Sequence, residues 1–298
     1  MRRLLVAICL AAVMSAQDDV VFRSGVSLVR VDAEAVDGSG RVVPGLTKDD
    51  FRVLDEGAPQ PIVDLSFDVE PLDLILLFDT SGSMKGKLLS VVRAAELGFH
   101  ELHASDRICV RAFGYDSTEM QPFTSNLQAV NEAILLRVLT TKFGGSSRME
   151  PAAGEAAIRF HTEPKTHRKR AVLIVTDKAG SRSASEMSIV HELWNSDAVL
   201  SELILSGSRD TKVMDAGGNA IVDNTGGATI VAGTPGDAFR DSVHYVRSGY
   251  AIYYAQPEAM PGSERKVKVE LTPEAAKRLP GIRVRARTGY IVPTQPGK

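Results

Sequence analysis

The sequence predicts an α/β domain with a doubly wound, mostly parallel sheet and helices on both faces, plus a β-sandwich built from the N- and C-terminal flanks. Three observations indicate this fold class. Residues 72–78, apolar apart from Asp73, and residues 171–176 are each followed by an aspartate, and both runs are typical of strands buried on two faces. Helical periodicity separates these runs along the chain. The flanks contain shorter strand patterns, of which residues 29–35 alternate between apolar and polar side chains.

The N-terminus has the pattern of a secretory signal peptide. Two arginines precede an apolar run at residues 4–13, and the small residues Ser15 and Ala16 follow it. The run is too short to span a membrane, although a retained N-terminal anchor is an alternative. We therefore expect residues 1–16 to be removed, leaving a secreted or periplasmic protein without a membrane span.

Composition limits the class of protein. The 298 residues are 44% hydrophobic and 24% charged, enough for one large core and a smaller second one. The net charge is -2, and loss of two arginines with the leader changes it to -4, because 33 basic residues then face 37 acidic ones. Nothing in this balance indicates nucleic-acid binding. Cys109 would be the only cysteine left, and we expect it to be a buried apolar residue.

The flanks contain short strand patterns separated by turn signals. The expected strands are, in chain order, residues 29–35, 51–54, 62–67, 250–255, 266–271 and 282–286. Neither flank has enough strands for an independent core. We therefore expect residues 17–69 and 249–298 to pair into one sandwich, with the α/β domain at residues 70–248 inserted between them.

Helices are expected between the strands of the α/β domain. From Lys85 onward, apolar residues recur every three or four positions, which is typical of one helix face. Residues 127–139 are also helical in pattern, and Pro151 suits the first turn of a third helix. A capping-box pattern at residues 183–186 starts a fourth helix, in which Trp194 is expected to be a core residue. Residues 165–170 form a basic run that we expect to be a solvated connection, with contact to an acidic partner as the alternative.

The strongest functional signal is the segment Asp79-Thr80-Ser81-Gly82-Ser83, which follows the first buried strand. It places a carboxylate and hydroxyls at the edge where open α/β sheets bind ligands. Chance would produce Asp-x-Ser-x-Ser in roughly one chain in fifteen of this length. The alternative is that Asp79 or Ser81 only caps the following helix.

Two further loops favour a metal site over a cap. Ser146 lies in a Gly-Gly-Ser-Ser loop, and Asp177 directly follows the second buried strand. Carboxylates and hydroxyls without cysteine or histidine suit Mg²⁺ or Mn²⁺, with Ca²⁺ possible.

These residues resemble the von Willebrand factor type A family, whose metal-ion-dependent adhesion site combines Asp-x-Ser-x-Ser with a Thr and an Asp on two further loops. The resemblance covers about residues 71–248. It implies that Ser81 and Ser83 ligate the metal directly, and that Asp79 and Asp177 act directly or through water. Ser146 stands where the family has Thr.

A second departure from the family is Lys178, which stands where the family usually has Gly. A nearby ammonium group weakens cation binding.

The flanks are similar to those of exported members of this family from Acidobacteria and related bacteria. The matching segments are residues 43–51, 56–60, 225–227 and 285–290. Taken singly, these segments could also be ordinary turns and strand starts.

The leading hypothesis is an exported, metal-dependent adhesion or protein-interaction module that binds an Asp or Glu of a partner protein through the cation. The alternative is a metal-free structural or interaction module of the cell envelope. We do not expect an enzyme, because the sequence has no evident pair of nucleophile and general base.

Overall fold

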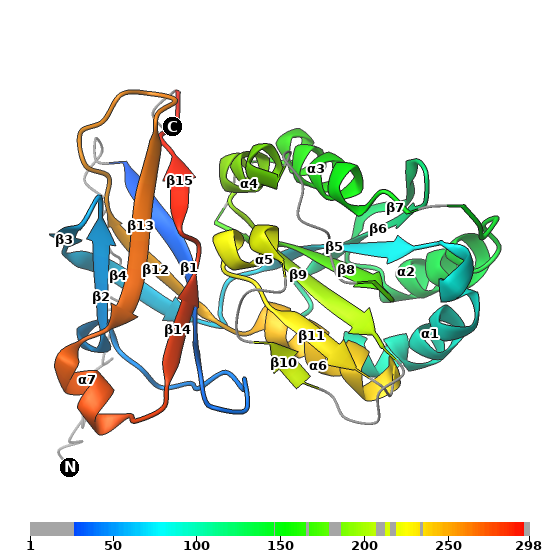
Figure 1. The fold of residues 1–298 in the computed structure, drawn as a ribbon, viewed down its shortest axis with the longest axis horizontal. Helices are drawn as coiled ribbons and strands as arrows, with labels where there is room; N and C mark the ends of the chain where they lie inside the picture. The colour runs from blue at the N-terminus through cyan, green and yellow to red at the C-terminus, as the bar shows by residue number, and fades with distance from the viewer. Residues whose placement is uncertain are drawn as a thin grey trace, which may run out of the picture.

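A seven-stranded sheet covered by helices lies beside two four-stranded sheets in the computed structural model (Figure 1). The structure describes residues 27–145, 147–164, 167–178, 186–206, 212–214, 219–232 and 235–294. The predicted fold class is confirmed. The predicted signal peptide lies outside the described residues, and the exact domain limits stay predictions. None of the described helices is both long and apolar enough to cross a membrane.

The large sheet has the strand order β10-β11-β9-β8-β5-β6-β7. Its five inner strands run parallel, and the edge strands β7 and β10 are antiparallel to their neighbours. The central strands β5, β8 and β9 are buried along their whole length, as their apolar sequences predict. The bounds are β5 Leu72–Asp79, β6 Arg107–Phe113, β7 Ser117–Thr124, β8 Lys169–Thr176, β9 Ala198–Leu205, β10 Lys212–Met214 and β11 Thr229–Ala232.

Helices cover both faces of this sheet. Alternate β5 side chains enter two different cores: Leu74 and Leu76 pack with α1 and α6, whereas Ile75 and Leu77 pack with α3, α4 and α5. The predicted helix at residues 127–139 is α2, which continues into a π-helix at Ile134–Val138. The bounds are α1 Lys85–Phe99, α2 Leu127–Ala133, α3 Met149–Arg159, α4 Glu186–Asn195, α5 Ala220–Thr225, α6 Pro235–Arg247 and, in the sandwich, α7 Pro273–Arg278.

Both sheets of the sandwich combine strands from the two flanks, as predicted. One has the order β14-β1-β12-β4 and the other β15-β13-β2-β3. Their bounds are β1 Leu28–Val36, β2 Phe51–Asp55, β3 Ala58–Gln60, β4 Ile62–Phe67, β12 Tyr250–Ala255, β13 Glu264–Leu271, β14 Arg283–Ala286 and β15 Gly289–Ile291. The chain therefore leaves the sandwich after β4, forms the α/β domain, and returns at β12.

A buried carboxylate joins the two sheets of the sandwich. Asp55 is fully buried, accepts 2.8 Å hydrogen bonds from the hydroxyls of Tyr254 and Tyr290, and pairs with Arg265 at 2.6 Å. Burial and the bond to Asp55 raise the pKa of Tyr290 to about 12. Tyr254 comes from β12 and Tyr290 from β15, so this polar cluster links side chains from both sheets.

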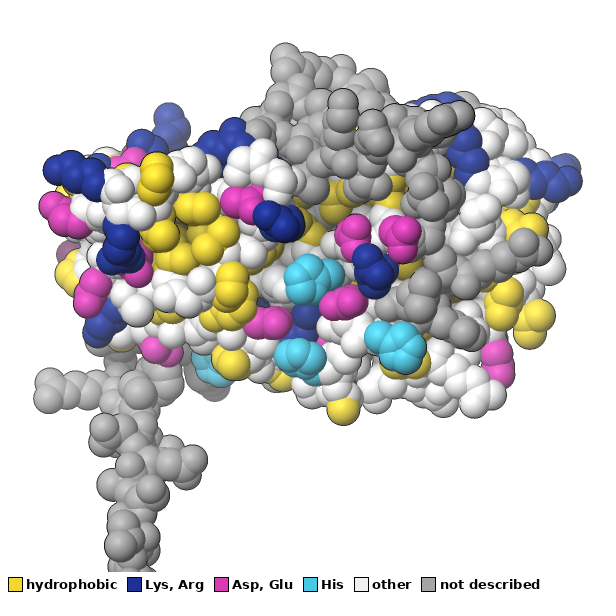
Figure 2. Space-filling model, turned by 90° about the horizontal axis from the view of Figure 1, so that it is seen from below, with side chains coloured by type: hydrophobic (Ala, Val, Ile, Leu, Met, Phe, Trp, Pro, Cys, Tyr) yellow, Lys and Arg dark blue, Asp and Glu magenta, His cyan; other side chains and the backbone are white. Residues whose placement is uncertain are grey.

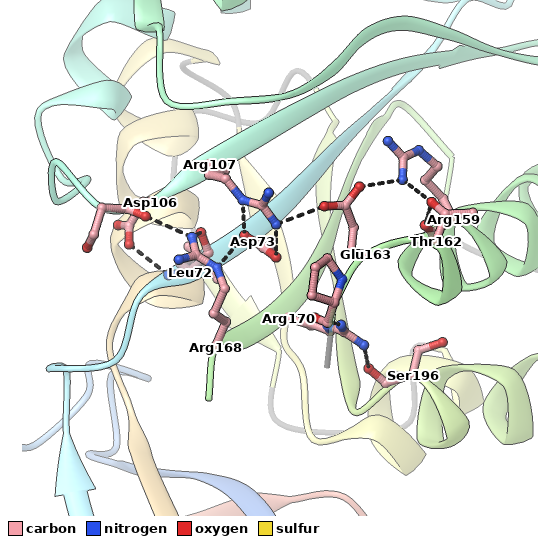
Figure 3. Close-up of polar contacts among 12 residues, drawn as sticks. Leu72, Asp73, Asp106, Arg107, Arg159, Thr162, Glu163, Arg168, Arg170 and Ser196 are labelled. Atoms are coloured by element: carbon pink, nitrogen blue, oxygen red, sulfur yellow. Dashed lines mark hydrogen bonds and ion pairs between the residues drawn. The ribbon is translucent and has the colours of Figure 1, made fainter. Parts of the chain in front are cut away.

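The N-terminal ends of the parallel strands carry an ion-pair network (Figure 3). Arg107 and Arg168 each pair with the buried carboxylate of Asp73 at 2.7 Å, and Arg170 donates to the carbonyl oxygen of Ser196 at 3.1 Å. Lys169 and Arg170 are only 7% and 5% exposed. The expectation of a solvated connection at residues 165–170 is therefore wrong for this part of the run, because its side chains neutralise and cap neighbouring strand ends.

Helices α4 and α5 lie directly against the sandwich strands β14 and β15. A Cβ atom at Gly226, whose φ is +83°, would lie 2.6 Å from the carbonyl carbon of Ala286, and one at Gly289 would lie 2.6 Å from the ring of Trp194. The Thr288 amide donates to the Asn224 carbonyl oxygen at 3.0 Å. Trp194 is buried, as predicted, and packs at this boundary.

The exposed side of α6 carries charges of both signs. His244 lies 2.9 Å from Glu101, and Arg240 pairs with Asp241 at 2.8 Å. Figure 2 shows acidic, basic and histidine side chains interspersed over the lower face of the molecule. Within the described part of this face, the charged side chains form no continuous basic surface.

Candidate metal centre

The predicted site lies at the C-terminal ends of two neighbouring strands. β5 and β8 pair in parallel up to Phe78 and Val175, so Asp79 and Asp177 emerge at the same edge of the sheet. This is the edge at which open α/β sheets bind ligands. The strand pairing therefore brings together two carboxylates that are 98 residues apart in the sequence.

Asp79 is completely buried and held by two donors. Its Oδ1 accepts a 2.7 Å hydrogen bond from the Ser81 amide, and its Oδ2 accepts one of 2.7 Å from the Thr176 hydroxyl. Sequence analysis missed Thr176. The available signal was a threonine at the last position of the strand that precedes Asp177.

The serines connect Asp79 to Asp177. The hydroxyls of Ser81 and Ser83 are 3.3 Å apart, and the Ser83 hydroxyl donates to Asp177 Oδ1 at 3.1 Å. Ser81 is the N-cap of the short 3₁₀-helix Gly82–Met84, yet its side chain makes no capping bond. Helix capping therefore does not account for the two hydroxyls, which point toward each other and toward the carboxylate.

The third predicted loop is only partly described. Ser146 lies outside the described residues, so its place in the site stays a prediction. Before Ser146, the Gly144 amide donates to the Thr80 carbonyl oxygen at 3.2 Å. After Ser146, the Arg148 amide donates to the Gly114 carbonyl oxygen at 2.9 Å. Both ends of the loop are thus tied to residues beside the Asp79 segment.

Lys87 is the residue of this site that sequence analysis missed most clearly. Its Nζ lies 2.9 Å from Asp177 Oδ2, while Ser83 occupies the other oxygen. Burial raises the pKa of Asp177, but the Lys87 ammonium and the Ser83 hydroxyl outweigh burial and bring that pKa below its usual value. Asp177 is therefore ionised at neutral pH. Lys178, the predicted source of repulsion, has an exposed side chain.

Comparison with known families now identifies the α/β domain. Residues 74–180, which contain all five predicted ligands, match the model of the von Willebrand factor type A domain. This segment is a von Willebrand factor type A domain. The similarity of the flanks to exported acidobacterial members stays a prediction.

Several solved structures resemble the chain. A von Willebrand factor type A protein from Catenulispora acidiphila is 12% identical, with 90% of this chain and 73% of that chain covered and a TM-score of 0.48. An aerotolerance-related membrane protein from Bacteroides fragilis is 15% identical, covering 59% and 98%, with a TM-score of 0.47. The manganese-loaded TRAP protein of Plasmodium vivax is 13% identical, covering 71% and 96%, with a TM-score of 0.46. No curated protein matches the chain significantly.

The donor set of the von Willebrand factor type A domain fits a hard divalent cation. Asp79, Ser81, Ser83 and Asp177 supply two carboxylates and two hydroxyls. The Ser81 amide donates to Asp79 at 2.7 Å, and the Ser83 hydroxyl lies 3.3 Å from that of Ser81 and 3.1 Å from Asp177. Such oxygen donors suit Mg²⁺ or Mn²⁺. Among the described residues, no group of three or more His, Cys, Asp or Glu side chains gathers as a metal site. A cation site at this edge therefore has to rely on the serine hydroxyls.

Proposed function

We propose that the von Willebrand factor type A domain binds Mg²⁺ or Mn²⁺ at Asp79, Ser81, Ser83 and Asp177, with Ser146 as a further ligand, and uses the cation to hold a partner protein. The observation that carries this proposal is the gathering of two carboxylates and two serine hydroxyls at one sheet edge, where the Ser81 amide holds Asp79 and the Ser83 hydroxyl contacts both Ser81 and Asp177. Neither serine hydroxyl is used to cap the helix that follows.

The chemistry of such a site favours an acidic partner residue. Asp79 is fully buried, whereas Ser83 is exposed, so the donor set opens to solvent on the Ser83 side. Protein oxygens and water fill most positions around a magnesium ion, and a carboxylate is a preferred ligand for a remaining one. An Asp or Glu of another protein is therefore the partner group that the site favours.

The cellular setting that we propose is secreted or periplasmic. It is supported by the basic and apolar N-terminal sequence. Cys109 is buried and forms no disulfide bond with any described residue. We propose a binding module and not an enzyme, because among the described residues of the site the carboxylate beside the Ser83 hydroxyl, Asp177, has a lowered pKa and is therefore a weak general base.

A second candidate is a metal-free interaction or structural module. The observation that favours it is the Lys87–Asp177 ion pair, which already neutralises one of the two carboxylates. A stable protein that binds neither Mg²⁺ nor Mn²⁺ at millimolar concentration would support this candidate.

The metal site is tested by Asp79→Asn, which removes the charge and keeps the shape. We expect calorimetric titration to show Mg²⁺ binding to the wild-type protein and an affinity at least about 100-fold lower for the variant, since loss of one of two carboxylates removes about 3 kcal/mol of attraction. Asp64→Asn, an exposed change in the sandwich, is the control and should bind like wild type. Equal affinities for wild type and Asp79→Asn would refute the site.

A further inference from the structure

The ammonium group of Lys87 contacts the carboxylate of Asp177, which is also a proposed ligand of the cation. Lys87 lies in the first turn of α1, and its Nζ contacts Asp177 Oδ2 at 2.9 Å. The Asp177 side chain is only 6% exposed, so the ammonium and the Ser83 hydroxyl together satisfy both of its oxygens. Both oxygens of Asp177 are thus hydrogen-bonded, and Lys87 neutralises its charge.

The charges around the site explain why this contact matters. Asp79 and Asp177 supply two negative charges, and the ammonium group of Lys87 places one positive charge directly against Asp177. A divalent cation and an ammonium group that share one carboxylate repel each other strongly at contact distances. Binding of a cation at Asp177 is therefore expected to weaken the Lys87 contact.

Lys87 has room to leave the site. Its side chain is 38% exposed although its terminus lies against Asp177, and a lysine stem is flexible. An ion pair whose ammonium group is partly open to water costs little to exchange. The contact is therefore strong enough to hold Asp177 and weak enough to be exchanged.

We propose that Lys87 is a resident counter-cation of the site: it holds Asp177 in the cation-free protein and is released when a divalent cation binds. This inference rests on the proposed function. In this role, Lys87 lowers the affinity of the site for a metal ion and holds the Asp177 side chain in place when no metal ion is bound. Its release also sets a second positive group beside the site, where an acidic partner would meet it.

The first test compares Lys87→Met with the matched variant Lys85→Met. Both changes remove one positive charge from the first turn of α1, but Lys85 is exposed and lies two residues away from the contacting position. We expect Lys87→Met to bind Mg²⁺ and Mn²⁺ up to about fivefold more tightly than wild type, and Lys85→Met to change affinity by less than about twofold.

The outcomes separate the two proposals. Equal or weaker binding by Lys87→Met, with clear binding by wild type, would overturn the role of Lys87 and leave the metal site intact. Absence of binding by all three proteins would overturn the metal site and the role of Lys87 with it.

A second test uses the wild-type protein and so does not depend on the folding of a variant. Brief acetylation with an amine reagent, read by mass spectrometry, compares Lys87 with Lys85 in the same molecule. We expect the Lys87 to Lys85 labelling ratio to rise about threefold or more when saturating Mg²⁺ replaces a chelator, because the released amine is solvated. An unchanged ratio at saturating Mg²⁺ would overturn the proposal.

Discussion

Gly227→Ala is expected to destabilise the protein by about 3 kcal/mol or more, or to prevent folding. A Cβ atom at this position would lie 1.9 Å from the carbonyl oxygen of Leu200 and 2.7 Å from its carbonyl carbon. Leu200 belongs to the fully buried strand β9, so its backbone has no free space into which it can move. The substitution would separate the end of α5 from the sheet.

Chemical denaturation followed by circular dichroism measures this effect. Gly86→Ala is the control, because Gly86 lies in α1 with open space around its Cα. Alanine is favoured over glycine within a helix by up to about 1 kcal/mol, so the control should be as stable as wild type or more stable. Wild-type stability for Gly227→Ala would contradict the packing of α5 against β9.

Glu202→Gln is expected to stabilise the protein at pH 8 by up to about 3 kcal/mol, and the gain should disappear near pH 4.5. Glu202 is fully buried in β9, where Asn219 donates a hydrogen bond to it and the Thr229 hydroxyl lies 3.5 Å away. Burial raises its pKa to about 7, and these two hydrogen bonds only partly oppose the rise. Above about pH 7 the folded protein therefore has to bury a negatively charged carboxylate.

The sign of the pH dependence follows from the raised pKa. The folded protein binds the proton of Glu202 more tightly than the unfolded chain, so stability from this group is present below about pH 4.5 and is lost as the pH rises through about 7. Denaturation of wild type and Glu202→Gln at pH 8, 6.5 and 5 measures the difference. Glu274→Gln, an exposed change in α7, should show no such trend. A Glu202→Gln difference that stays constant with pH would contradict this explanation.

The sequence predicts the frame of the site well because that frame depends on local patterns. Residues 72–78 and 171–176 are apolar enough to identify β5 and β8, and the residues after them fall at one sheet edge by topology alone. Asp79, Ser81, Ser83 and Asp177 lie next to one another in the structure, and their role as metal ligands stays a prediction.

The contacts that tune the site could not be predicted in this way. Thr176 and Lys87 reach Asp79 and Asp177 across 97 and 90 residues. Lys85 and Lys87 both stand in the first turn of α1, and only the rotation of that helix against the sheet decides which one contacts Asp177. Hydrophobic periodicity does not fix helix rotation to within one side chain.

The basic run at residues 165–170 shows a second limit. Its charges suggest exposure to solvent, yet Lys169 is buried and donates to the Ser248 carbonyl oxygen at 3.0 Å. The returning chain and the sandwich cover these strand ends. A sequence pattern does not show which polar surface a distant segment of the same chain will cover.

The most direct test of the central claim is a calorimetric Mg²⁺ titration with and without an acidic peptide, acetyl-Gly-Glu-Gly-amide, and its Gln analogue. If the cation holds a partner carboxylate, the Glu peptide and Mg²⁺ must each tighten the binding of the other by the same factor, and the Gln peptide must not. Mg²⁺ affinity that is the same with both peptides, or Glu-peptide binding that persists in a chelator, would contradict the claim.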